Sequence, residues 1–247
     1  MISMEEAGIK ILFEDNHLLC VIKPPGILSQ GDVTEDPDML SLLKGYIKKK
    51  NNKPGDVYLG LVHRLDRPVG GVMAFARTSK AAARLSEQIR DHIFKKTYYA
   101  VLTGDLPEPS GKLRNIIIKE KWNNTVRVLP QAEEWDVKNS ATLEFRRIEV
   151  KQGVTLAEIN LVTGKPHQIR AQFAYHGFPV IGDRKYKSNL LGNINDRDRM
   201  AGSRFNDVKW PALWAWKIEF HHPVNKEMMC LTAGMPDYYP WTLFNNY

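Results

Sequence analysis

The chain has 247 residues, of which 43% are hydrophobic and 26% are charged. This composition is typical of a globular protein with an ordinary core. The formal net charge is +7, which is compatible with a polyanionic partner such as nucleic acid. No apolar run approaches the ~20 residues that a membrane-spanning helix needs, and residues 1–6 lack the start of a signal peptide. We therefore expect a cytoplasmic protein with no membrane partner.

The two cysteines, Cys20 and Cys230, each lie inside an apolar run. Free cysteine often behaves as a small buried hydrophobe. The spacing fits neither a disulfide framework nor a zinc site. We therefore expect both side chains to be buried, in a protein that functions in a reducing compartment.

The first elements predicted are two short strands, over residues 9–14 and 17–23. The following stretch, Lys23-Pro24-Pro25-Gly26-Ile27, forces extended backbone and then a tight bend. Asp36-Pro37 predicts a helix start, with Asp36 as the N-cap. Apolar residues at helical spacing continue this helix to three lysines at 48–50, whose charge suits a helix C-terminus.

A charged turn, VHRLDRPVGG over residues 62–71, lies between two apolar runs at 57–62 and 72–76. Both runs are short and rich in β-branched or aromatic residues, so they predict buried strands. A carboxylate such as Asp66, held at a turn between core strands, is a rigidly supported functional group. The alternative is that Asp66 is an ordinary turn residue paired with Arg64 or Arg67.

The middle of the chain predicts a helix over residues 79–90, capped by Thr78-Ser79, and then a strand over 94–104. Two adjacent tyrosines on that strand, Tyr98 and Tyr99, must face opposite sides of the sheet.

A hairpin is predicted next, from Asn115 through the turn Asn123-Asn124 to Pro130. Basic residues and a tryptophan gather near its tip, namely Lys119, Lys121, Trp122 and Arg127. Such a tip suits phosphate contact and base stacking. A solvated edge hairpin is the alternative.

Paired strands over 140–150 and 154–162 lead into TGKPHQIR, and HQIR predicts a helix start with Gly177 at its C-terminal end. Residues 184–209 predict either a variable surface loop or a loop that grips RNA. Strands over 213–223 and 228–233 follow. The aromatic tail from Pro236 is expected to pack on the domain.

Three of these stretches, in this order, resemble the signatures of the RluA-type RNA pseudouridine synthases. HRLDRPVGG resembles HRLD-R-x-(S/T)-S-G, Lys96-x-Tyr98-x-Ala100 resembles a second conserved stretch, and TGKPHQIR resembles TGR-x-HQIR. Weaker similarity, including KP-x-G near the start and GD-x-x-Y from Gly182, extends from about residue 10 to 236. The chain departs from the pattern at Val69 and Gly70, where a hydroxyl residue and Ser are usual, and at Lys165, where Arg is usual.

The resemblance implies an α+β fold, with a mixed, mostly antiparallel sheet in two halves flanked by helices around a central cleft. It also implies a single catalytic domain over residues 1–247, without the small N-terminal RNA-binding (S4) domain of many relatives. Asp66 maps onto the catalytic aspartate, Tyr98 onto the tyrosine against the target base, and Arg170 onto the partner of the catalytic carboxylate. RNA contacts are expected at His63, Arg64, Arg67, Lys96, Lys165, His167, Gln168 and Ile169.

The implied reaction breaks the N1–C1′ bond of uridine, rotates the uracil and joins C5 to C1′. It changes no oxidation state and needs no group donor, so we expect no cofactor and no metal. Burial raises a carboxyl pKa by up to ~3–5 units, whereas an adjacent arginine lowers it by ~1–3. We therefore expect Arg170 to keep Asp66 ionised and to fix it by two hydrogen bonds. Attack at C1′, attack at C6 and proton abstraction to a glycal all remain open.

The expected partner is ribosomal or transfer RNA, with the target uridine flipped or in a loop. We expect a monomer without a protein partner. Two other functions remain open: a non-catalytic RNA-binding or ribosome-assembly factor, and a carboxylate glycosidase. The glycosidase needs a second carboxylate, and none is obvious near the HRLD or HQIR motifs.

Overall fold

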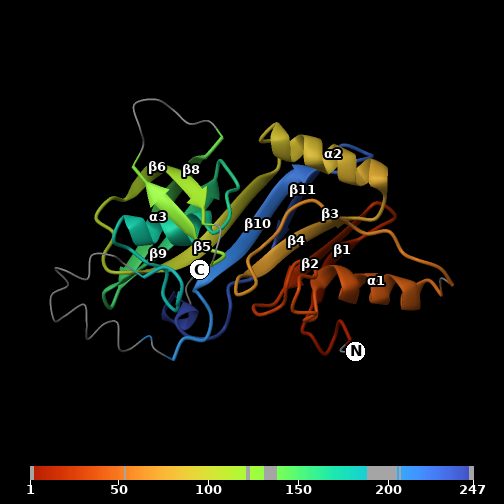
Figure 1. The fold of residues 1–247 in the computed structure, drawn as a ribbon, viewed down its shortest axis with the longest axis horizontal. Helices are drawn as coiled ribbons and strands as arrows, with labels where there is room; N and C mark the ends of the chain where they lie inside the picture. Colours follow the sequence, from red (N-terminus) through yellow and green to blue (C-terminus); the bar gives the residue numbers. More distant parts are fainter. Residues whose placement is uncertain are drawn as a thin grey trace. The chain divides into compact units, whose positions relative to one another are not determined.

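The computed structural model describes residues 3–52, 54–120, 123–130, 138–187, 205 and 207–244. The chain forms two compact units (Figure 1). Unit 1 comprises Met1–Lys96 and Ala215–Gly234, and unit 2 comprises Thr97–Trp214 and Met235–Tyr247. Unit 1 is therefore built from two segments that are far apart in the sequence.

Unit 1 contains a sheet in which β1 (Lys10–Glu14), β2 (Leu18–Lys23), β4 (Gly70–Ala76) and β10 (Leu213–His221) follow one another. A short strand, β3 (Gly60–Leu61), pairs with β4, and β11 (Met228–Thr232) pairs with β10. Strand β4 is buried at every position, which confirms the buried strand predicted after Gly71. The strand predicted over 57–62 was too long, because only Gly60 and Leu61 pair with β4.

Two helices, α1 (Met39–Lys50) and α2 (Ser79–Arg90), belong to unit 1. The cap of α2 is Thr78, as predicted, since its hydroxyl accepts the Ala81 N–H at 3.1 Å. The predicted cap of α1 was wrong by two residues. Asp38 holds that position and accepts the Ser41 N–H at 3.1 Å, whereas Asp36 forms an ion pair with Arg67.

Unit 2 contains the antiparallel order β5 (Lys95–Thr103), β9 (Val154–Leu161), β8 (Ser140–Lys151), β6 (Ser110–Lys119) and β7 (Val126–Leu129). These strands confirm the hairpin and the strand pair expected from the sequence. Strand β5 enters the unit at Thr97.

Helix α3 (Gln168–Tyr175) lies against β6 and β7 (Figure 1). A small apolar cluster joins it to these strands and to β8: Ile117, Val126, Ala141 and Ala171. The helix begins at HQIR and is followed by Gly177, which has a φ of +90°, as expected. The tail forms a short 3-10 helix, η1 (Trp241–Phe244), with both terminal aromatics buried, which confirms that this segment packs down.

The cysteine prediction was half right. Cys20 on β2 is fully buried, but Cys230 on β11 is exposed. The side chains of β11 alternate between exposed and half-buried positions, so its apolar run does not place every side chain in the core. Among the described residues, no helix is both long enough and apolar enough to cross a bilayer.

Two predictions fall on parts of the chain outside the described residues. One is the tip of the β6–β7 hairpin at Lys121 and Trp122. The other is most of the 184–209 loop, namely 188–204 and 206.

Candidate active site

The loop that carries Asp66 runs from β3 to β4 without regular secondary structure. Lys23, at the end of β2, is completely buried beneath it. The Nζ atom of Lys23 donates to the backbone carbonyls of Val69 at 2.7 Å, Arg67 at 3.0 Å, Pro24 at 3.1 Å and Asp66 at 3.4 Å. One buried side chain thus ties three residues of the loop to the end of a core strand.

Burial lowers the pKa of Lys23 to about 7, while the neighbouring Asp66 acts in the opposite direction. Taking an ammonium group out of water disfavours its charged form. The carbonyl groups around Nζ compensate in part, since each accepts a hydrogen bond.

The bend after β2 supplies a second set of contacts to the loop. The Ser29 hydroxyl donates to the Leu65 carbonyl at 2.7 Å and accepts the Leu65 N–H at 3.1 Å. Gly26 N–H donates to the Arg67 carbonyl at 2.8 Å, and Arg67 Nε donates back to the Gly26 carbonyl at 3.0 Å. The residues on both sides of Asp66 are therefore fixed to the bend, while the Asp66 side chain is half-buried.

His63 braces the start of the same loop. Its Nε2 accepts the Ala74 N–H at 3.0 Å, and its ring lies 5.3 Å from the ring of Phe94. Burial lowers the pKa of His63 to about 3, so the ring is neutral at physiological pH. The imidazole is only 8% exposed, so His63 supports the loop, and the expected RNA contact stays a prediction.

The basic residues expected to contact RNA in unit 1 differ in exposure. Arg64 is exposed, and Lys96 is half-buried with its pKa lowered by burial. Arg67 is also exposed and forms an ion pair with Asp36 at 2.7 Å. Arg64 and Arg67 are therefore more accessible than Lys96.

In unit 2, Tyr98 is buried on β5 opposite Ile159. Its neighbour Tyr99 pairs across the strands with Glu158 and is half-buried. The pKa of Tyr99 is raised by burial and by Glu158. Because side chains alternate along a strand, the two tyrosines face opposite sides of the sheet, as the sequence indicates.

Arg170 lies in the first turn of α3 and is only 4% exposed. Its Nε donates to Asp183 Oδ2 at 2.6 Å, and its Nη2 donates to Asp183 Oδ1 at 2.9 Å. The ring of Tyr186 lies 5.3 Å from the guanidinium carbon. Sequence reasoning placed Asp183 in the GD-x-x-Y match but gave it no role. The signal available was the rule that a buried arginine requires an anionic partner.

The other residues of TGKPHQIR organise the start of α3. Gln168 Oε1 accepts the Lys165 N–H at 3.0 Å and the Thr163 hydroxyl at 2.9 Å, and its amide donates to a β8 carbonyl. Gln168 and Ile169 are both 3% exposed. Their burial indicates that they support the helix start, and the expected RNA contact at both residues stays a prediction. Lys165 is half-buried and donates to the carbonyl of Lys138.

His167 adopts a left-handed conformation, with φ +53°. Its Nδ1 lies 2.6 Å from the Tyr186 hydroxyl, which also accepts the Val126 N–H at 2.9 Å. The residue is half-buried. His167 therefore links the helix start to Tyr186 and, through it, to β7.

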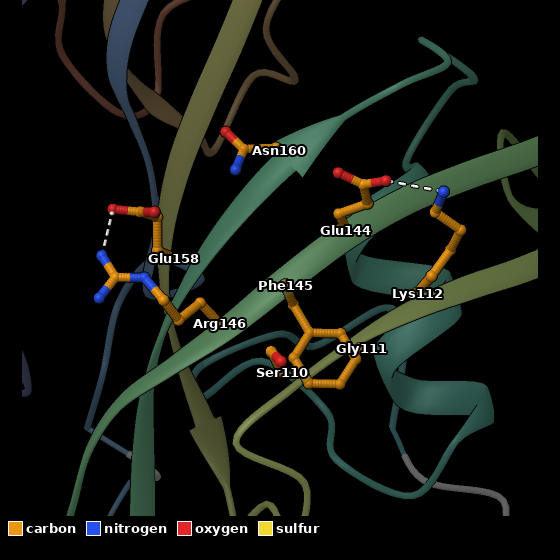
Figure 2. A pocket seen from close by; sticks show the side chains of 8 residues that line it. All are labelled: Ser110, Gly111, Lys112, Glu144, Phe145, Arg146, Glu158 and Asn160. Atoms are coloured by element: carbon orange, nitrogen blue, oxygen red, sulfur yellow. Dashed lines mark hydrogen bonds and ion pairs between the residues drawn. The ribbon is translucent and has the colours of Figure 1, made fainter.

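The sheet of unit 2 also has a shallow hollow of about 450 Å³ (Figure 2). Its charged side chains are paired across strands, Lys112 with Glu144 at 2.7 Å and Arg146 with Glu158 at 3.2 Å. None of the predicted site residues lines it. The lining residues are Ser110, Gly111, Lys112, Glu144, Phe145, Arg146, Glu158 and Asn160. The hollow is thus separate from the candidate active-site residues.

Comparison with solved structures identifies the fold. The human RNA pseudouridylate synthase domain containing 4 matches with a TM-score of 0.73 at 22% identity, covering 95% of this chain and 91% of the solved one. The human domain containing 1 matches with a TM-score of 0.68 at 18% identity, covering 96% and 86%. The fold is that of pseudouridine synthase domains, which confirms the predicted α+β class with a mostly antiparallel sheet.

The family model for RNA pseudouridylate synthase matches residues 17–175. The ribosomal large subunit pseudouridine synthase C of Buchnera aphidicola subsp. Baizongia pistaciae is 30% identical, covering 96% of this chain and 70% of the relative. Synthase D of Xylella fastidiosa is 30% identical, with 94% and 68% covered. The chain belongs to the RNA pseudouridylate synthase family, a family of isomerases, as its motifs predicted.

Two further relatives are longer than this chain, and the aligned region covers only part of each. Synthase C of Vibrio parahaemolyticus is 28% identical, and the match covers 91% of this chain but 65% of the relative. The uncharacterized RNA pseudouridine synthase YhcT of Bacillus subtilis is 29% identical, with 94% and 70% covered. The chain therefore spans about two thirds of the length of these relatives.

Proposed function

We propose that this chain isomerises specific uridines in RNA to pseudouridine, with Asp66 as the catalytic residue. The observation that carries the proposal is the anchoring of the Asp66 loop in a chain of this family. Lys23 and Ser29 hold the backbone of residues 65–69. A fixed backbone on both sides of a reactive carboxylate supplies the pre-organisation that catalysis needs.

In the proposed reaction, Asp66 acts as an anion, either as a nucleophile at C1′ or C6 or as a base that removes a proton. Arg170 is proposed as its charge partner. Tyr98 is proposed to stack on the target base and to receive the C5 proton at the end of the reaction. A flipped uridine suits these roles, because the reacting atoms are inaccessible within a stacked helix.

Basic residues of the two motifs are proposed to contact the RNA backbone. Arg64 and Arg67 are exposed in the Asp66 loop, and the half-buried Lys165 lies in TGKPHQIR. Phosphate contacts by such side chains supply affinity but little sequence discrimination.

The names of the relatives make large-subunit ribosomal RNA the first substrate to test, with transfer RNA as the second. Pseudouridines are mapped by carbodiimide treatment and primer extension, in cells with and without the gene. We further propose a monomer acting in the cytoplasm. A set of marks that disappears with the gene identifies the target uridines.

The decisive experiment replaces Asp66 by Asn and by Glu. Tritium at C5 of uridine is released to water during isomerisation, and we expect either variant to lower the turnover number by at least about 1,000-fold. RNA affinity should change by less than threefold, because the carboxylate carries little of the binding. Asp56→Asn is the matched control, since Asp56 is an exposed aspartate of the same unit, and it should keep full activity.

Full tritium release by Asp66→Asn would contradict the proposal. Wild-type protein that binds RNA without releasing tritium would point to a non-catalytic RNA-binding factor. Release of free uracil in place of pseudouridine would point to glycosidase chemistry.

A further inference from the structure

The guanidinium of Arg170 is held along one edge. Its Nε and Nη2 meet both carboxylate oxygens of Asp183, and the two side chains are 5% and 0% exposed. Two parallel charge-assisted hydrogen bonds fix a guanidinium in its plane and in its rotation within that plane. The direction of the remaining nitrogen, Nη1, is therefore set by Asp183.

Asp183 is itself immobilised by its own turn. Its Oδ1 also accepts the N–H groups of Lys185 at 2.9 Å and Tyr186 at 3.1 Å. Its backbone N–H donates to the Val180 carbonyl at 3.1 Å. The preceding Gly182 has a φ of +75°, and a Cβ there would lie 2.6 Å from the Trp210 carbonyl oxygen. The carboxylate is thus a rigid acceptor whose place is set by local backbone.

Tyr186 restrains the guanidinium from a second direction. Its ring lies 5.3 Å from Arg170 Cζ. Its hydroxyl is bound to His167 and to the Val126 N–H. The ring is therefore fixed at its far end to β7, and Arg170 is restrained by two residues of one short segment, 183–186.

We propose that Asp183 is a positioning residue that orients Arg170 for the role of charge partner proposed above, with Tyr186 supporting the same orientation. The inference rests on the proposed function. Asp183 acts through Arg170 and does not contact RNA in this role. Its loss should therefore lower the turnover number and leave KM largely unchanged.

The first test is Asp183→Glu, which keeps the negative charge and lengthens the side chain by one methylene. A displacement of about 1 Å in an active-site group can cost ~100-fold. We expect the turnover number in the tritium-release assay to fall by about 10- to 100-fold, with KM within threefold of wild type. Asp105→Glu, at an exposed aspartate of the same unit, is the matched control and should have no effect.

The second variant is Asp183→Asn, which conserves the volume of the side chain. Its amide NH2 group would face an N–H group of Arg170, so one of the two hydrogen bonds would be replaced by two donors that face each other. A double-mutant cycle with Arg170→Lys separates the effect on the orientation of Arg170 from a general loss of protein stability. Lysine cannot be oriented by a fork of two hydrogen bonds. The effect of Asp183→Asn on the turnover number should therefore shrink at least fivefold in the Arg170→Lys background, whereas any loss of thermal stability should persist.

Three outcomes would overturn the positioning role: a turnover number of Asp183→Glu within twofold of wild type, a rise in KM alone, or failure of both Asp183 variants to fold. The proposed function has a separate test. If wild-type protein makes pseudouridine and Asp66→Asn does not, a normal turnover number for Asp183→Glu removes the positioning role alone.

Discussion

Two buried cations occupy the candidate active-site regions, and they are stabilised in different ways. Arg170 has a carboxylate partner, and a guanidinium stays charged at any pH that a protein survives. Lys23 is surrounded by backbone carbonyls, and lysine loses its proton readily when it is buried. The anchoring of the Asp66 loop is therefore the more sensitive of the two to pH.

Lys23 leads to a prediction about stability and pH. Its pKa is lowered to about 7 in the folded state, mainly by burial, and stays near ~10.4 in the unfolded chain. Between these values the unfolded state binds more protons, so the stability of the folded state rises with pH. We expect the free energy of unfolding of wild type, relative to Lys23→Met, to increase between pH 7 and 10 by on the order of 1 kcal/mol per pH unit.

The measurement is urea unfolding of both proteins at several pH values. Subtraction removes the titration of all other groups that the two proteins share. A difference that stays constant from pH 7 to 10 would show that the carbonyl groups keep Lys23 charged throughout, and would contradict the prediction.

Asp66 and Arg170 could be picked out from local motifs because each lies inside a characteristic string of residues. The residues that hold Asp66 and Arg170 in place could not be picked out from local motifs. Ser29 meets Leu65 across 36 positions of the chain, and Asp183 meets Arg170 across 13. Such contacts are set by tertiary packing, which leaves no periodic trace in the sequence.

The helices and strands were largely predictable, because their apolar spacing and caps are local signals. The pattern gave α2 and its cap correctly, and it gave the pairing of β8 with β9. The pattern gave wrong ends where they depend on tertiary contacts. The N-cap of α1 is Asp38 and not Asp36, which pairs with Arg67. Strand β3 is short because only two of its residues pair with β4.

Gly71, near the start of β4, allows a close approach of the β10 backbone to β4. It has a φ of +122°, and a Cβ there would lie 2.2 Å from the Ala215 carbonyl oxygen. We expect Gly71→Ala to lower the free energy of unfolding by about 3 kcal/mol or more, because the clash involves backbone and the conformation disfavours L-residues. Thermal or urea unfolding measures the change.

The control for this substitution is Gly45→Ala on the exposed side of α1. A Cβ at Gly45 meets nothing within 4 Å. Alanine in a helix interior is favoured over glycine by roughly 0.5–1 kcal/mol, so this variant should be more stable than wild type. Equal stability of Gly71→Ala and wild type would show that β10 can move away from β4 without cost.

The molecule as a whole carries a net charge of +7, which has a consequence for RNA binding. For single-stranded RNA the logarithm of the binding constant falls with log salt at a slope of about −0.7 per phosphate contact. About four contacts would weaken binding roughly 50-fold between 50 and 200 mM salt. Filter binding of a target-loop RNA checks the slope, and affinity that does not change with salt would rule out an electrostatic interface.

The assignment of chain segments to the two units could not be predicted from the sequence. The fold class followed from motif order, but the placement of residues 215–234 with residues 1–96 depends on strand pairing across the length of the chain. A strand sequence such as LWAWKIEFH indicates that the strand is buried, but it does not specify which strands pair with it.

This discontinuity affects how the protein is made on the ribosome. Until β10 is synthesised, β3 covers only Phe75 and Ala76 on one side of β4, and the rest of that side has no strand to bond. At about 5 to 20 residues per second, translating residues 77–212, which separate β4 from β10, takes roughly 7 to 27 s. For that time most of one edge of β4 lacks a strand partner, although β2 pairs with the other edge, so chaperone binding during translation should centre on residues 70–76 and end once β10 emerges.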